Sequence, residues 1–107
     1  MAEIHKEIIK KIVDKEKELI GEVAFMHVKK LEFMDIDESG NISFSEEIER
    51  EHLEKVIDTY RKVLKGGAVA AAREALKEYD PSELVTVDLP EEILPRDVKV
   101  KKFTSSF

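Results

Sequence analysis

The 107-residue chain contains no cysteine and no tryptophan. Because there is no thiol, disulfides, thiolate metal sites and cysteine nucleophiles are excluded. No apolar run approaches the roughly eighteen residues that a membrane-spanning helix needs. The first twenty residues are charged throughout, so no secretory signal is expected either. The sequence therefore predicts a cytoplasmic protein that does not associate with membranes.

Positive charge is in deficit, with 18 Lys and Arg against 24 Asp and Glu, a net charge of −6 and a pI near 5.1. A protein that binds duplex nucleic acid needs Lys and Arg to displace counterions, so no nucleic-acid partner is expected. An acidic balance instead favours solubility and cation partners. The length suits one domain, and 42% apolar residues are enough for a packed core.

Apolar residues recur at helical spacing over residues 3–34, with a charged interruption at 14–18 and a glycine at position 21. One long helix and two helices broken near Gly21 both fit this pattern. The alternative for the second half is an α+β fold with a β-hairpin around residues 23–46. In that hairpin Met34 and Ile36 would face Phe44 and Ile42 across a turn at 37–41.

Helical patterns also dominate the second half of the chain. Ser45 is expected to cap a helix that begins at Glu46 and ends at Lys65, before the Gly66–Gly67 stop signal. Residues 68–79 restart a helix of high propensity, which Pro81 ends. Residues 83–89 and 98–103 are strand-like. The sequence thus predicts a predominantly α, bundle-like fold with a small C-terminal β element. Residues 1–80 would form a helical domain, and 81–107 an extended or β arm packing on it.

The most specific stretch is DIDESGNISFSE, residues 35–46. Carboxylates stand at its first, third and twelfth positions, oxygen-bearing residues at the fifth, seventh and ninth, and glycine at the sixth. Calcium takes six to eight oxygens, and a tightly turning loop can converge such groups on one point. The stretch resembles the calcium loop of the EF-hand family. The resemblance implies Ca²⁺ held by Asp35, Asp37, Ser39, Asn41, Ser43 and Glu46.

The resemblance covers these twelve residues and not the flanking helices. Glu47, Arg50 and Glu51 are charged where the family has apolar residues, and no second loop is present. A structural cation site is therefore favoured over a calmodulin-like switch. A hairpin would remove the calcium site, because Glu46 could not return to the ion. The alternative function is then a non-enzymatic interaction or assembly module, forming a homo-oligomer or binding a protein, with the loop only an acidic turn.

Two weaker patterns complete the sequence reading. Glu49 and His52 share a helix face at the spacing of di-iron sites, but the further ligands that such a site needs are missing. No ordered catalytic set is present, so no enzyme activity is expected. The basic residues Arg96, Lys99, Lys101 and Lys102 form a local patch that is either solvated or docked on acidic helices of this or another chain.

Overall fold

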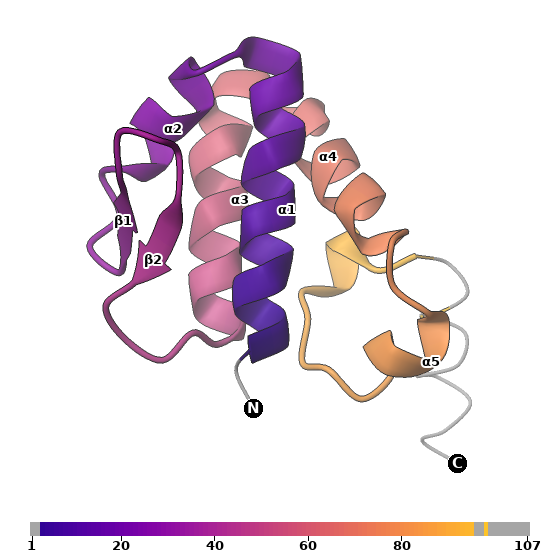
Figure 1. Cartoon of the computed structure of the whole chain (residues 1–107). Coiled ribbons are helices and arrows are strands. Elements are labelled where there is room, and N and C mark those ends of the chain that lie inside the picture. The colour runs from indigo at the N-terminus through magenta and orange to yellow at the C-terminus, as the bar shows by residue number, and fades with distance from the viewer. Residues whose placement is uncertain (1–2, 96–97, 99–107) are drawn as a thin grey trace.

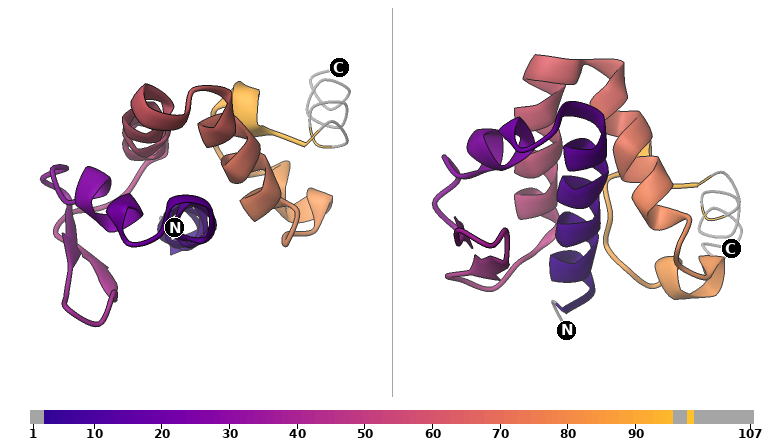
Figure 2. Two further views of the ribbon diagram at one scale, coloured as in Figure 1. Left: turned by 90° about the horizontal axis from the view of Figure 1, so that it is seen from above. Right: turned by 45° about the horizontal axis from the view of Figure 1, so that its top comes forward.

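The computed structural model describes residues 3–95 and 98, and it confirms a predominantly α fold with a small β element. Helices α1 (Glu3–Ile20), α3 (Arg50–Leu64) and α4 (Gly66–Leu76) pack against one another (Figure 1). Helix α2 (Val23–Val28) and the strands β1 (Met34–Ile36) and β2 (Ile42–Phe44) lie to one side of α1. Helix α5 (Pro81–Leu84) lies to the other (Figure 2). The 3₁₀ helix η1 (Glu91–Ile93) contacts α4.

Helix α1 carries the stripe on which the core is built. Ile8, Ile9, Ile12 and Val13 recur at intervals of one, three and four residues, and all four are fully buried. Each such side chain stabilises the fold by roughly 1.5–3 kcal/mol relative to an exposed position. Helix α4 meets α1 and α3 through small side chains, which allow close approach. Its buried residues are Ala68, Ala71, Ala72, Ala75 and Leu76.

The break between α1 and α2 falls at Gly21. This residue has a φ of +76°, and its N–H donates to the carbonyl of Lys17 at 2.8 Å. A glycine reaches this left-handed conformation without the penalty that a side chain imposes. The chain therefore forms two helices here, not one long helix. Among the described residues, no helix is both long enough and apolar enough to cross a bilayer.

Residues 34–44 form the β-hairpin of the alternative prediction. Met34 pairs with Phe44 and Ile36 with Ile42, in antiparallel register. The helical interpretation is correct for residues 23–28 and wrong for the strands. The hairpin is favoured because it buries Met34, which is 3% exposed, in the main core. A helix over residues 34–44, most of which are polar, would have no comparable apolar face to bury.

The predicted helix start at Glu46 is wrong, because Ser45 belongs to the hairpin. Its N–H donates to the carbonyl of Phe33 at 3.1 Å, and its hydroxyl donates to the carbonyl of Glu32 at 3.2 Å. Helix α3 begins only at Arg50, after Glu49 in extended conformation. Ser45 thus closes the two-stranded segment instead of capping a helix.

No strand forms over the described residues 81–95, so the strand-like segment 83–89 is a second correction. The carboxylate of Asp80 accepts a hydrogen bond from the N–H of Ser82 at 3.1 Å, and Pro81 occupies the first helical position. This N-terminal capping pair starts α5 and overrides the β propensity of Val85 and Val87. Apart from Val98, the strand-like segment 98–103 lies outside the described residues.

A carboxylic acid occupies one core position of α1. Glu16 follows Ile12 by four residues and Val13 by three, and its side chain is fully buried. Neither of its carboxyl oxygens has a hydrogen-bond partner among the described residues. The hydroxyl of Tyr60, which the charge of Glu16 influences, donates to the carbonyl of Ala24 at 2.8 Å. Burial raises the pKa of Glu16 to about 7.

Replacing Glu16 by Gln is expected to remove a pH dependence of stability. The unfolded chain ionises Glu16 near pH 4.5 but the folded chain only near pH 7, so stability falls as pH rises between these values. The loss amounts to roughly 3 kcal/mol above pH 7. Urea unfolding from pH 4 to 8 should show that the free energy of unfolding of Glu16→Gln rises relative to that of the wild type as pH rises. The exposed Glu18→Gln is the matched control, and parallel wild-type and Glu16→Gln profiles would contradict the assignment.

Candidate functional site

The predicted calcium ligands lie along the hairpin and beyond it, not around one point. Asp35 in β1 pairs with Ser43 in β2, and both side chains are exposed on the face opposite Met34. Asp37, Ser39 and Asn41 form the turn between the strands. Glu46 lies past the end of β2. The twelve residues thus form most of the hairpin and the start of the segment that leads to α3, whereas an EF-hand loop joins two helices.

The carboxylate of Asp37 organises the turn. Its Oδ1 accepts hydrogen bonds from the N–H groups of Ser39 and Asn41, each at 2.9 Å, and its Oδ2 accepts one from the Asn41 amide at 3.2 Å. The hydrogen bonds from Asn41 are the main reason why the pKa of Asp37 lies below its usual value. This is the local chemistry by which Asp favours turns.

Gly40 completes the turn and allows it to pack against α2. Its φ of +87° belongs to the left-handed region. A Cβ placed on this residue would lie 3.3 Å from the ring of Phe25. The hairpin tip therefore packs closely against α2, and the glycine is explained by the fold.

The side chain of Glu46 forms a hydrogen bond with His52 of α3. Its Oε1 lies 2.8 Å from Nε2 of His52, and Nδ1 of the same ring accepts a hydrogen bond from the N–H of Glu49 at 2.9 Å. The Glu49 side chain in turn accepts a hydrogen bond from the backbone N–H of His52, so the pair caps α3 reciprocally. The Glu49–His52 spacing is thus explained by a helix cap.

Within residues 3–95 and 98, no three His, Asp or Glu residues are grouped so that they could hold a metal ion. Calcium binding at residues 35–46 stays a prediction, but the ligand set that it requires is not assembled in this hairpin. Strands β1 and β2, not helices, adjoin the turn, so the resemblance to the EF-hand family does not extend to its flanking helices.

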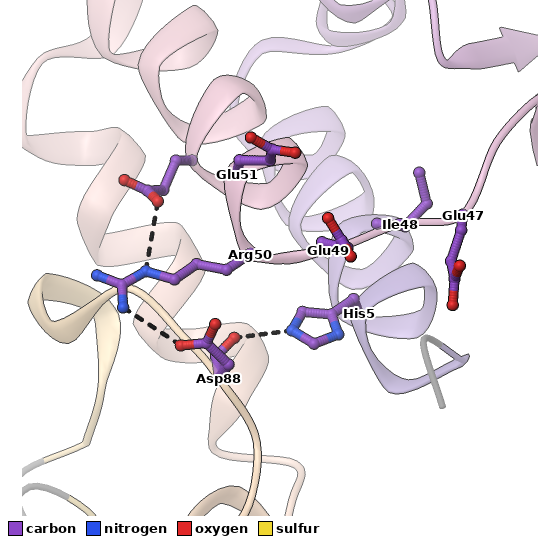
Figure 3. A pocket seen from close by; sticks show the side chains of 8 residues that line it. His5, Glu47, Ile48, Glu49, Arg50, Glu51 and Asp88 are labelled. Carbon is purple, nitrogen blue, oxygen red and sulfur yellow. Dashed lines mark hydrogen bonds and ion pairs between the residues drawn. The ribbon is translucent and has the colours of Figure 1, made fainter.

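An open groove of about 550 Å³ lies between the first turns of α1 and α3 and residue 88 (Figure 3). Its lining includes five carboxylates, those of Glu47, Glu49, Glu51, Glu54 and Asp88. We call it the acidic groove. Three segments far apart in sequence contribute to it, since His5 and Asp88 are 83 positions apart.

The single guanidinium of the acidic groove is already neutralised. Nε of Arg50 lies 3.3 Å from a carboxylate oxygen of Glu54, and its Nη1 lies 3.2 Å from one of Asp88 (Figure 3). Glu47 and Glu51 have no cation partner among the described residues. The groove therefore presents uncompensated negative charge, which attracts cations.

His5 supplies a second polar feature of the same groove. The residue is 9% exposed, and Nε2 of its ring lies 2.7 Å from the backbone carbonyl oxygen of Asp88. Because a carbonyl only accepts, Nε2 carries the hydrogen, and in the neutral ring Nδ1 then has a free lone pair. Nδ1 is buried and has no hydrogen-bond partner within the described residues.

Comparisons of this chain with protein-family models, with curated proteins and with solved structures find no match. Sequence reasoning missed the acidic groove, because it treated His5 as uninformative and placed Asp88 in a strand. The one usable signal was the acidic run at residues 46–51, which was assigned to the start of a helix. Nothing in the sequence indicated that residues 5 and 88 meet.

Substituting Gly40 by Ala should destabilise the protein by about 1–2 kcal/mol, since it adds backbone strain and a close contact with Phe25. Gly21→Ala is the control, because it has a similar φ but nothing within 4 Å of the added Cβ. We expect a smaller loss there, about 1 kcal/mol. Equal losses measured by urea unfolding would show that the Phe25 contact contributes nothing.

Calorimetric titration with calcium, in the presence of magnesium, tests the sequence prediction directly. We expect no saturable binding, because Asp37 already accepts three hydrogen bonds and Glu46 bonds His52. Saturable binding that Glu46→Gln abolishes would show instead that residues 35–46 rearrange around the ion. That result would restore the calcium site.

Proposed function

We propose that this chain is a non-enzymatic interaction module whose acidic groove binds a cationic protein segment. The observation that carries the proposal is the uncompensated carboxylate lining of the groove, with Arg50 held by Glu54 and Asp88.

The shape of the groove suits a chain segment rather than a small molecule. It is open to solvent, and Ile48 is the only apolar residue in its lining. Small-molecule sites are mostly enclosed and apolar. A lysine-rich segment would place its ammonium groups against the carboxylates of the groove. Binding governed by exposed charges is fast and depends strongly on salt.

Fluorescence anisotropy with a labelled hexalysine peptide tests this function. The wild type is expected to bind it saturably at low salt, and to bind hexaglutamine not at all. The double variant Glu47→Gln/Glu51→Gln should weaken hexalysine binding roughly five- to tenfold, since each exposed ion pair contributes up to about 1 kcal/mol.

A charge-matched control separates the groove from overall charge. Glu22 and Glu38 are exposed and lie near α2 and the hairpin turn, away from the acidic groove. Glu22→Gln/Glu38→Gln changes the net charge equally and should leave hexalysine affinity nearly unchanged. An equal loss in both double variants would mean that affinity follows net charge, and the proposed site would be wrong.

A further inference from the structure

A buried acid lies where three helices meet. Glu16, near the end of α1, is fully buried, and neither of its carboxyl oxygens has a hydrogen-bond partner among the described residues. Burial and the charge of Glu16 both raise the pKa of Tyr60 in α3. The Tyr60 hydroxyl in turn donates to the carbonyl of Ala24 in α2 at 2.8 Å. These three residues thus join α1, α2 and α3, which contact one another (Figure 1).

No cation of the described residues forms an ion pair with Glu16. The charged and titratable side chains around this junction are exposed or half-buried: Asp14, Lys15, Lys17 and Glu18 in α1, Glu22, His27 and Lys29 in or beside α2, Asp58, Arg61 and Lys62 in α3, and Arg73 and Glu74 in α4. Lys17 lies 5.2 Å from the ring centroid of Phe25, and Arg61 is paired with Asp58 and Glu92. The hydroxyl of Tyr60 is therefore the buried donor that an ionised Glu16 would meet.

Helix α2 buries little apolar surface of its own. It has six residues, of which Ala24 and Val28 are buried, whereas Val23 and Met26 are 47% and 65% exposed. It follows α1 through Gly21, whose left-handed backbone lets the chain change direction. Segments with few buried apolar contacts are the parts of a fold that open most easily. A single hydrogen bond to α2 therefore has a large effect on whether this helix stays docked.

We propose that Tyr60 is a latch for α2: its hydroxyl holds Ala24 while Glu16 is protonated, and it turns to the Glu16 carboxylate and releases α2 once that acid has lost its proton to water. A phenol has one O–H, so a bond to one acceptor is made at the expense of the other. The carboxylate is the stronger acceptor, because hydrogen bonds to an ionised group are roughly twice as strong as those between neutral groups. A buried carboxylate without a partner is also the more costly group to leave unsatisfied.

The exchange takes place near neutral pH, because burial raises the pKa of Glu16 to about 7. In more acidic solution the carboxyl is neutral and α2 is latched. As the pH rises through this value, Glu16 ionises and the hydrogen bond from Tyr60 to Ala24 is lost. The release of α2 exposes Ala24 and Val28, which are fully buried in the latched structure.

Carbon-13 NMR of the full chain from pH 5 to 8.5 tests the latch at its two acceptors. In the wild type the carboxyl carbon of Glu16 and the carbonyl carbon of Ala24 are expected to titrate with one shared midpoint near pH 7. The shift of the Ala24 signal reports the loss of the hydrogen bond from Tyr60. The methyl signals of Ile8 and Ile12, which are buried in α1, should stay unchanged, and this separates the release of α2 from unfolding.

Two variants separate the acid from the hydroxyl. Glu16→Gln should keep the Ala24 carbonyl signal at its low-pH position throughout the titration. In Tyr60→Phe the Glu16 carboxyl should still titrate, while the Ala24 signal no longer follows it. Tyr79→Phe and Glu18→Gln are the matched controls, because the Tyr79 hydroxyl has no hydrogen-bond partner among the described residues and Glu18 is exposed. Both controls should titrate like the wild type.

An Ala24 signal that does not follow the titration of Glu16 in the wild type overturns the latch, and so does one that still follows it in Tyr60→Phe. A Glu16 midpoint near pH 4.5, the value of an unperturbed carboxyl, also overturns it. Joint loss of the native Ile8, Ile12 and Ala24 signals would show that ionisation unfolds the whole chain, which contradicts a local release. The wild type and Glu16→Gln decide the proposal even where Tyr60→Phe does not fold.

Discussion

The packing of α1 is the constraint on which the rest of the structure depends. Helices α2, α3 and α4 all contact it, and its buried isoleucines leave little freedom in how those helices are placed. The short α2 follows from α1 through Gly21 and presents Phe25 to the hairpin turn. At the opposite end, the first turn of α1 brings His5 to Asp88. Helix α1 thus positions both candidate sites. It positions the hairpin through α2, and it contributes directly to the acidic groove.

The ambiguity of residues 35–46 has a physical origin. A calcium loop and a tight hairpin turn both need an early aspartate, a left-handed glycine and a neighbouring amide. In one case the carboxylate binds an ion and in the other it binds backbone N–H groups, so the local sequence alone does not separate them. The decision is tertiary: Met34 is buried in the core, and Gly40 meets Phe25 of α2. Neither contact is visible from the spacing of the loop residues.

Elements with their own strong local signals could be predicted from the sequence. Periodicity and glycine positions indicated the α1 stripe, the end of α3 near Lys65 and an alanine-rich helix after it, and they left a break at Gly21 as one of two possibilities. The conformation of residues 83–89 was not predicted, because the capping preference of Asp80–Pro81 outweighs the β propensity of the β-branched residues that follow. The acidic groove could not be predicted, since it is made of side chains from three distant segments. Only the acidic run beside α3 was apparent in advance.

The negative charge that lines the groove also destabilises the folded state, and interactions at the start of α3 oppose this effect. Like charges at the start of α3 repel one another, and this repulsion weakens the folded state. The N-terminal end of the helix dipole favours Glu51, and the reciprocal cap between Glu49 and His52 holds the first turn in place. Backbone hydrogen bonds therefore hold the first turn of α3, while Glu47 and Glu51 take part in no ion pair among the described residues.

The buried acid on α1 makes folding a proton-uptake reaction. Between about pH 5 and pH 6.5 the unfolded chain has mostly lost the Glu16 proton and the folded chain has mostly kept it, so each molecule that folds takes up nearly one proton from the buffer. The heat released by that buffer then becomes part of the measured enthalpy of unfolding. Two buffers of different ionisation enthalpy would therefore give different calorimetric enthalpies for the same conformational change.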